Sequence, residues 1–271
     1  MPLRADFPDI RTVPADLEVP ATLAAAALPA PGKRVRQTLP AYAGTEVHHT
    51  LWLPTDWTPR RRYPVIVEYA GNGNYRNQFG DVSEGTVEGS RMGYGLSGGK
   101  GFIWLCLPYV SEDGKSNQIA WWGDAAATAD YCRRAVEHVC ASHGGDPARL
   151  ILAGFSRGAI ACNYIGLRDD AIARLWRAFI PYSHYDGPRR WQYADSDQES
   201  ALTRLRRLNG RPQFIIHENS VEETQKWIAS TGVEAPFTFR ALNFRNHNDS
   251  WTLRDIPERR EARAWLAKVL A

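Results

Sequence analysis

The sequence predicts an α/β protein built on a doubly wound, mostly parallel sheet with helices on both faces. Short apolar runs rich in β-branched and aromatic residues recur along the chain, and each ends at a glycine, a proline or a polar residue. Helix-like stretches lie between several of these runs. Continuous apolar strands suit a sheet that is buried on both faces, and the alternation of strand and helix is typical of parallel α/β architecture.

The expected elements follow one another from residue 47 onward. The strand candidates are residues 47–53, 63–70, 101–107, 149–153, 176–180, 212–216 and 237–244. The helix candidates are residues 125–142, 156–167, 200–208, 222–230 and 258–270. In such a sheet, ligands bind outside the carboxyl ends of the strands, so that edge is where we expect the functional residues.

Two segments do not fit this alternation. Residues 1–40 hold seven prolines, which block long regular structure, so we expect an N-terminal arm lying over a single domain that spans residues 1–271. Residues 71–101 hold ten glycines without a legible helix. Such a long connection after a central strand is either a mobile active-site loop or irregular scaffold.

Composition narrows the classes of function. The chain has 271 residues, 44% hydrophobic and 23% charged, with a formal net charge of +3. This balance gives no electrostatic case for a nucleic-acid partner, and no apolar run reaches the roughly 18 residues of a membrane span. The N-terminus carries acidic residues where a signal peptide needs lysines, so the chain as written is expected to be cytoplasmic, or secreted if a signal was removed.

A Gly-x-Ser-x-Gly motif marks the expected reactive centre. Ser156 stands between Gly154 and Gly158, after the strand candidate 149–153 and at the start of a helix candidate. In this context the motif predicts a tight strand-to-helix turn, where flanking side chains would clash and the serine hydroxyl rises out of the sheet at a helix N-terminus.

With this motif, with the order of strands and helices and with a late histidine, the chain resembles the α/β-hydrolase superfamily, and within it compact esterase-like serine hydrolases. The resemblance covers residues 45–271 and implies a nucleophilic serine, an acid and a histidine in that chain order. His247 is the best candidate base, because it follows the last strand candidate and precedes the closing helix. A neutral imidazole there would accept the proton of Ser156.

The acid is less defined, because the expected aspartate is missing after the strand candidate 212–216. Glu218 stands directly at that strand end and is the first choice. Asp186 is the alternative if the acid follows the preceding strand, and Glu222 is a third candidate that could instead begin a helix. Whichever carboxylate acts must orient the imidazole and stabilise its protonated form.

The resemblance also implies an oxyanion hole and a binding surface. The N–H of Arg157, after the nucleophile, is one expected donor, and the other comes from Asn72 or Gly73 in the loop after strand candidate 63–70. Aromatic and histidine side chains near the expected strand ends are candidates for substrate binding, namely Tyr109, Trp121, Trp122, His184 and Trp251.

The sequence thus predicts an esterase-type serine hydrolase that needs no cofactor and no metal and cleaves a small-molecule or saccharide-linked ester, either carbohydrate-linked or aromatic. A prolyl-oligopeptidase-like peptidase and a non-catalytic binding protein on a hydrolase scaffold are the alternatives. A metallohydrolase is a further alternative, because three histidines are each followed by a carboxylate one or two residues later. The spacing of these residues matches no known metal motif. The sequence does not indicate an oligomeric state.

Overall fold

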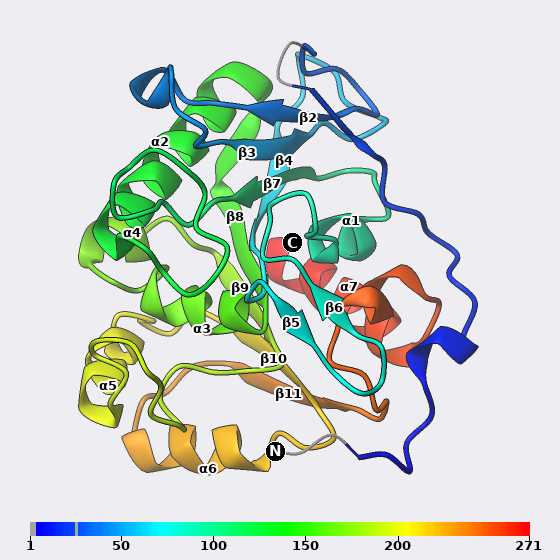
Figure 1. Cartoon of the computed structure of the whole chain (residues 1–271), viewed down its shortest axis with the longest axis vertical. Helices are drawn as coiled ribbons and strands as arrows, with labels where there is room; N and C mark the ends of the chain where they lie inside the picture. The colour runs from blue at the N-terminus through cyan, green and yellow to red at the C-terminus, as the bar shows by residue number, and fades with distance from the viewer. Residues whose placement is uncertain (1–3, 25–26) are drawn as a thin grey trace.

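A computed structural model of the chain describes residues 4–24 and 27–271, and its centre is a nine-stranded sheet (Figure 1). The strands from β7 to β11 along the sheet are all parallel, whereas β3 pairs antiparallel with β2 and with β7. In their order across the sheet they are β1 (Thr22–Leu23), β2 (Arg34–Gln37), β3 (His49–Trp52), β7 (Ile103–Leu107), β4 (Tyr63–Tyr69), β8 (Gly145–Phe155), β9 (Ala178–Tyr182), β10 (Gln213–Glu218) and β11 (Phe237–Leu242).

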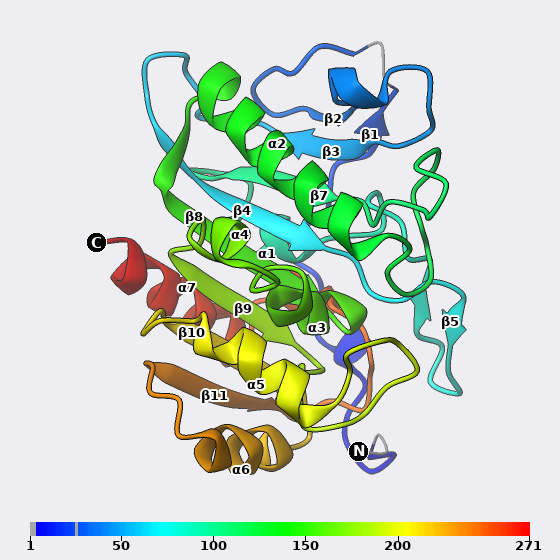
Figure 2. The same cartoon turned by 90° about the vertical axis from the view of Figure 1, so that its left-hand side faces the viewer.

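Helices cover both faces of this sheet (Figure 2). One face packs against α2 (Ala125–His143), α3 (Arg157–Tyr164), α4 (Asp170–Ala173), α5 (Gln198–Arg206) and α6 (Glu222–Thr231). The other face packs against α1 (Met92–Ser97) and α7 (Pro257–Leu270). All side chains of β4 and β7 are buried because helices pack on both faces of the sheet. The predicted doubly wound, mostly parallel sheet is therefore confirmed.

Some element boundaries differ from the prediction. We expected the fifth strand to end at Pro181, but β9 continues to Tyr182, with Pro181 opposite Gly154 of β8. The helix α1 was not expected because its sequence contains Gly93 and Gly95. A side chain at Gly93 would collide with the ring of Trp104, so the glycines allow the helix to pack closely on the sheet.

The glycine-rich segment 71–101 is more ordered than an irregular scaffold. Besides α1, it forms a hairpin from β5 (Tyr75–Arg76) and β6 (Val82–Ser83). The buried carboxylate of Glu68, in β4, accepts hydrogen bonds from the N–H groups of Met92 and Gly93 and from the indole of Trp104. This carboxylate satisfies donors at the start of α1 that have no acceptor within the helix.

The proline-rich N-terminal segment is partly an arm and partly an edge of the sheet. It contributes β1 and β2 and the short 3-10 helices η1 (Ile10–Thr12) and η2 (Pro40–Tyr42). The arm is held against the C-terminal part of the chain, where the backbone N–H of Ile10 donates to Asn246 and Asp16 pairs with Arg259. In the part of the chain described, no helix is long and apolar enough to cross a lipid bilayer.

Candidate active site

Ser156 sits on a strained turn between β8 and α3. Its φ and ψ are 54° and −114°, a conformation that L-residues rarely adopt. A Cβ on Gly154 would lie 2.2 Å from the carbonyl oxygen of Gly158, and one on Gly158 would lie 2.0 Å from that of Tyr69. Only glycine fits at these two positions, which gives the predicted Gly-x-Ser-x-Gly motif its physical reason. The backbone N–H of Ser156 is tied to Tyr182 of β9 at 2.9 Å.

The structure brings Ser156, His247 and Glu218 together, although 91 residues separate the first two. Nε2 of His247 lies 3.1 Å from Oγ of Ser156, and Nδ1 lies 2.9 Å from Oε1 of Glu218. All three side chains are buried or nearly so. An ionised carboxylate can only accept a hydrogen bond, so Nδ1 carries the proton and Nε2 presents its lone pair to the serine hydroxyl.

Glu218 is held in its ionised form. Burial by itself would raise the pKa of this carboxyl, but the charge attraction and hydrogen bond of His247 outweigh burial and lower the pKa to about 2. Because β10 extends to Glu218, its side chain lies at the carboxyl edge of the sheet.

The two other acid candidates lie elsewhere. Asp186 is buried in an ion pair with Arg204, with Nε to Oδ2 at 2.7 Å, so it serves the packing of α5. Glu222 is exposed in the first turn of α6, where it faces Lys226. Neither carboxylate contacts His247, and both alternatives are therefore wrong for this structure.

Asp81, in the turn between β5 and β6, is a buried residue at the site that the sequence analysis did not identify. Its carboxylate accepts from the backbone N–H of His247 at 2.8 Å and from the side-chain amides of Asn246 and Asn248 at 2.9 and 2.6 Å. The hairpin therefore clamps the loop that carries His247. No sequence motif marks this aspartate, because its partners in the loop that carries His247 follow more than 160 positions later.

Of the three expected oxyanion donors, Arg157 and Asn72 remain candidates and Gly73 does not. Helix α3 begins at Arg157, so its N–H belongs to the first turn, which has no acceptor within the helix. The side chain of Asn72 accepts from the N–H of Trp121 at 2.7 Å and fixes the loop after β4. Gly73 is excluded because its N–H already donates to Ile119, with N and O 2.6 Å apart.

The buried side chain of Arg157 holds together the loops around the serine turn. It is only 1% exposed, and its guanidinium donates to the carbonyls of Gly71, Gly85 and Trp121 while it stacks 3.8 Å from the ring centre of Tyr109. Burial lowers the pKa of Arg157 to about 10, which leaves it charged at neutral pH. One buried cation thus holds together three segments around the elbow.

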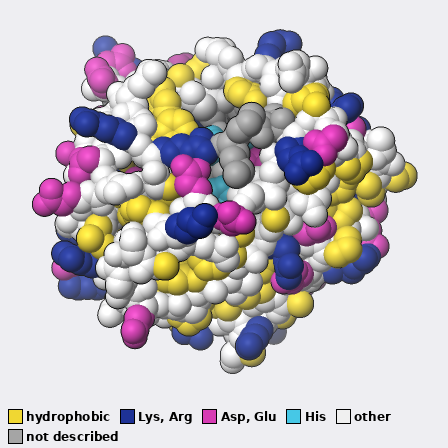
Figure 3. All heavy atoms as spheres, turned by 90° about the horizontal axis from the view of Figure 1, so that it is seen from below, with side chains coloured by type: hydrophobic (Ala, Val, Ile, Leu, Met, Phe, Trp, Pro, Cys, Tyr) yellow, Lys and Arg dark blue, Asp and Glu magenta, His cyan; other side chains and the backbone are white. Residues whose placement is uncertain are grey.

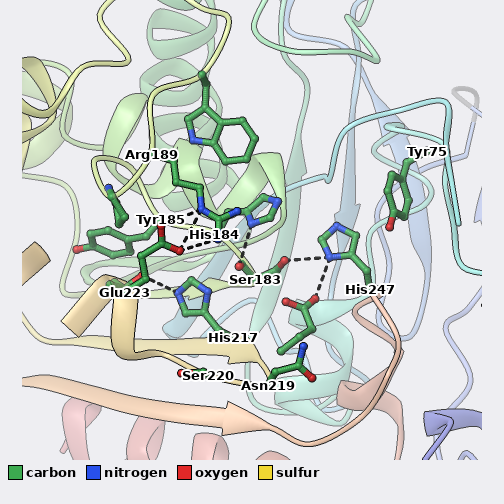
Figure 4. A pocket seen from close by; sticks show the side chains of 14 residues that line it. Tyr75, Ser183, His184, Tyr185, Arg189, His217, Asn219, Ser220, Glu223 and His247 are labelled. Atoms are coloured by element: carbon green, nitrogen blue, oxygen red, sulfur yellow. Dashed lines mark hydrogen bonds and ion pairs between the residues drawn. The ribbon is translucent and has the colours of Figure 1, made fainter. Parts of the chain in front are cut away.

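A cavity of about 250 Å³ opens beside His247 (Figure 4). Its walls come from the loop after β9, from the end of β10, from the start of α6 and from the hairpin through Tyr75. The imidazoles of His184, His217 and His247 all border it. Figure 3 shows the molecule from the lower side of the view in Figure 1. Histidine side chains are visible on this surface, with acidic and basic side chains beside them.

The predicted substrate-binding aromatics are mostly core residues. Tyr109 and Trp122 are 1% and 4% exposed within the core beneath α2 and α3, and Trp251 is fully buried on the opposite face, beside Tyr182. These three assignments were wrong because proximity to a strand end does not determine which way a side chain points. Trp121 is half-buried, at φ 54°, and His184 lines the cavity.

Within residues 4–24 and 27–271, no three histidine, cysteine or acidic side chains are grouped so that they could hold a metal ion. His217 contacts Thr224, and Asp249 pairs with Arg91 at 3.0 Å. Of the three carboxylates in the histidine–carboxylate neighbours considered in the sequence, Asp186 pairs with Arg204, Asp249 with Arg91 and Glu218 with His247.

No protein-family model and no curated protein sequence matches the chain. Solved structures do resemble it. A putative dipeptidyl aminopeptidase IV from Bacteroides ovatus aligns with a TM-score of 0.60 and 13% identity over 87% of this chain, which spans only 35% of that protein. One of two fungal esterases from Rhizomucor miehei aligns at 0.56 and 11% identity, covering 88% of this chain and 82% of its own.

The feruloyl esterase module from Clostridium thermocellum aligns at 0.54 and 11% identity, over 90% of this chain and 94% of that one. At such low identity these likenesses concern the fold. They agree with the mostly parallel sheet and its covering helices. The chain has the α/β-hydrolase fold.

Proposed function

We propose that the protein is a serine hydrolase of the esterase type that works through an acyl intermediate on Ser156. The observation that carries this proposal is that His247 bridges the other two residues. Its Nε2 lies 3.1 Å from Ser156 Oγ, and its Nδ1 lies 2.9 Å from Glu218 Oε1. These distances lie within the range over which a general base takes a proton from a nucleophile.

The reaction would begin when His247 Nε2 takes the hydroxyl proton as Ser156 Oγ attacks the ester carbonyl. Glu218 then stabilises the imidazolium that forms, without itself taking the proton. The oxygen of the tetrahedral intermediate would be held by the N–H of Arg157 and by the N–H of Asn72. The contacts of Asn72 and of the Arg157 guanidinium support this assignment because they fix both segments before substrate arrives.

The alcohol or acyl group of the ester is proposed to be carbohydrate-linked or aromatic. The cavity beside His247 supports a compact substrate, since its volume of about 250 Å³ is below the 300–1,000 Å³ of sites for drug-sized ligands. Its walls mix aromatic side chains with histidine, hydroxyl and amide groups. A long acyl chain would find little continuous apolar surface there.

A fluorophosphonate probe tests the proposed nucleophile directly. We expect the folded protein to be labelled on Ser156, and Ser156→Ala to lose all labelling. His247→Ala and Glu218→Gln should label more slowly, with ester turnover reduced about 10³-fold or more. Ser90→Ala, at another buried serine whose carbonyl accepts from Arg34, is the control and should be labelled like the native protein.

A substrate panel separates the alternatives. Turnover of p-nitrophenyl acetate without turnover of peptide p-nitroanilides supports the esterase, whereas preferred cleavage of the anilides would favour the peptidase. A folded protein that the probe does not label would contradict the proposal and favour a binding protein.

A further inference from the structure

We propose that the cavity beside His247 binds the alcohol half of the ester, and that this half is a single sugar ring. This inference rests on the proposed acyl transfer at Ser156 and specifies its substrate. The cavity is bordered by His247, Glu218 and Ser183 and not by Ser156, so it lies beside the imidazole rather than over the nucleophile.

The chemistry places the alcohol on that side. When the tetrahedral intermediate breaks down, the bond from carbon to the alcohol oxygen breaks and its electron pair stays with that oxygen. The oxygen takes the proton from Nε2 of His247, leaving the acyl group on Ser156 and a neutral imidazole. The alcohol oxygen must therefore lie within hydrogen-bond reach of Nε2, and the group attached to it extends into the space beside the imidazole.

The charged groups in the wall of the cavity favour an uncharged ligand. Arg189 and Glu223 form a bidentate pair, with Nη2 to Oε2 at 2.6 Å and Nε to both carboxylate oxygens at 3.0 Å. Glu218 is paired with His247. None of these side chains therefore offers an unpaired charge to a ligand.

Of the two other histidines in the wall, His184 can bind a hydroxyl of the ligand. Nδ1 of His184 lies 3.0 Å from the carbonyl of Ser183, so this imidazole donates there and keeps Nε2 as an acceptor. Nε2 of His217 lies 3.1 Å from the hydroxyl of Thr224. Burial lowers the pKa of His184 to about 3 and also lowers the pKa of His217, so both rings are neutral at physiological pH. The neutral ring of His184 therefore offers an acceptor that an imidazolium would not, whereas Nε2 of His217 already contacts Thr224.

An aromatic side chain completes the site. Trp191 lines the cavity, and its ring contacts those of His184 and Trp121, with centroids 5.1 and 5.8 Å away. Its backbone is fixed by the buried Ser196, whose hydroxyl accepts from the Trp191 N–H at 3.1 Å and donates to its carbonyl at 2.8 Å. A pre-positioned aromatic face packs against the C–H face of a pyranose, while the polar groups bind its hydroxyls.

Three acetate esters with the same acyl group separate a sugar from other alcohols. These are a 6-O-acetylated methyl glucopyranoside, glycerol monoacetate and ethyl acetate. We expect kcat/KM for the sugar ester to exceed that for ethyl acetate by about tenfold or more, mainly through KM. Glycerol offers hydroxyls without a ring face, so its ester should rank between the two.

The variant Trp191→Ala tests the aromatic face. We expect the ratio of kcat/KM for the sugar ester to that for ethyl acetate to fall about tenfold, and Trp191→Phe to recover part of the loss. Trp265→Ala is the matched control, because Trp265 is also half-buried but packs against Phe214 on the other face of the sheet. Its ratio should equal that of the native protein.

A binding measurement makes the inference independent of turnover. In the Ser156→Ala protein, saturation-transfer NMR should detect methyl glucopyranoside through its ring protons, and the added Trp191→Ala change should abolish the signal. Sugar binding without probe labelling of Ser156 in the native protein would contradict the proposed hydrolase but support the sugar site. Ester turnover with no sugar preference and no saturation transfer would overturn the sugar site and leave the hydrolase intact. An equal preference for glycerol and sugar esters that Trp191→Ala does not change would also overturn it.

Discussion

The hydroxyl of Ser183 lies 3.1 Å from Nδ1 of His247, the same nitrogen that Glu218 contacts at 2.9 Å. Ser183 follows β9, one strand before the glutamate, and has a φ of 89°. Two oxygens from neighbouring strand ends therefore converge on one imidazole N–H.

This convergence predicts a rescue. Glu218→Gln should lower kcat by about 10³–10⁴-fold, because an amide does not stabilise the imidazolium. Adding Ser183→Asp should recover at least about tenfold of kcat, since aspartate tolerates a positive φ and returns a carboxylate to Nδ1. The measurement is steady-state turnover of p-nitrophenyl acetate by the single and double variants. Adding Ser183→Asn instead should recover nothing, and equal rescue by Asn would show that charge is not what matters.

The clamp on the histidine loop predicts that Asp81→Asn impairs catalysis more than substrate binding. An amide cannot accept all the hydrogen bonds that this carboxylate takes, so the loop around His247 loses part of its support. We expect kcat to fall about tenfold or more while KM changes little, with slower labelling of Ser156 by the probe.

Asp16→Asn is the matched control for this prediction. It weakens the ion pair between Asp16 and Arg259. This ion pair attaches the N-terminal arm and does not touch the loop that carries His247. It should lower the melting temperature with little effect on kcat. Equal kcat losses in the two variants would argue against a local clamp.

The close packing at the elbow predicts that Gly158→Ala is severely destabilising. The new methyl group would overlap the Tyr69 carbonyl, so either β4 or α3 must shift. We expect the free energy of unfolding to drop by about 3 kcal/mol or more, measured by urea denaturation. In Gly89→Ala the nearest atom is 3.4 Å away, an ordinary contact, so this control should lie within about 1 kcal/mol of the native protein. A Gly158→Ala variant as stable as the control would contradict the packing account.

A buried histidine far from the site predicts acid sensitivity. His49 is 1% exposed and bonded to the hydroxyl of Tyr131, and burial lowers its pKa to about 3. Between pH 6.5 and pH 3 the unfolded chain therefore binds a proton at this position that the folded chain does not. Stability should fall as the pH falls through this range, by up to about 1.4 kcal/mol per pH unit from His49.

The comparison is urea unfolding at pH 7 and pH 5. His49→Gln should reduce the loss of stability between the two pH values, whereas His138→Gln, at an exposed position, should not. Identical pH slopes in all three proteins would exclude His49 as a source of the acid sensitivity.

The parts of the fold that the sequence predicts well are those with a strong local pattern. The apolar run of β4 and the serine motif after β8 depend on residues that are adjacent in the chain, so their structure can be deduced locally. Glu218 was the first of three acid candidates, and the sequence did not show that β10 extends to it or that its carboxylate contacts His247.

The parts that were missed depend on distant contacts. Helix α1 forms in a glycine-rich stretch because Glu68 accepts hydrogen bonds from its first turn and Trp104 packs against Gly93. These two contacts cannot be inferred from the sequence of the helix itself. Asp81 acquires its role only when the loop at residues 246–248 folds against it. Trp251 lies in a segment predicted to be a loop near the site, but its side chain points into the core and packs there.

The attachment of the N-terminal arm has a consequence for the order in which the protein matures during synthesis. The N–H of Ile10 reaches Asn246 across 236 positions, and Asp9 pairs with Arg245. Contacts of such long range form late in folding. The nucleophile segment leaves the ribosome about ninety residues before its base, so we expect a nascent chain to carry an inert serine until the loop with His247 has emerged and bound the segment around Ile10.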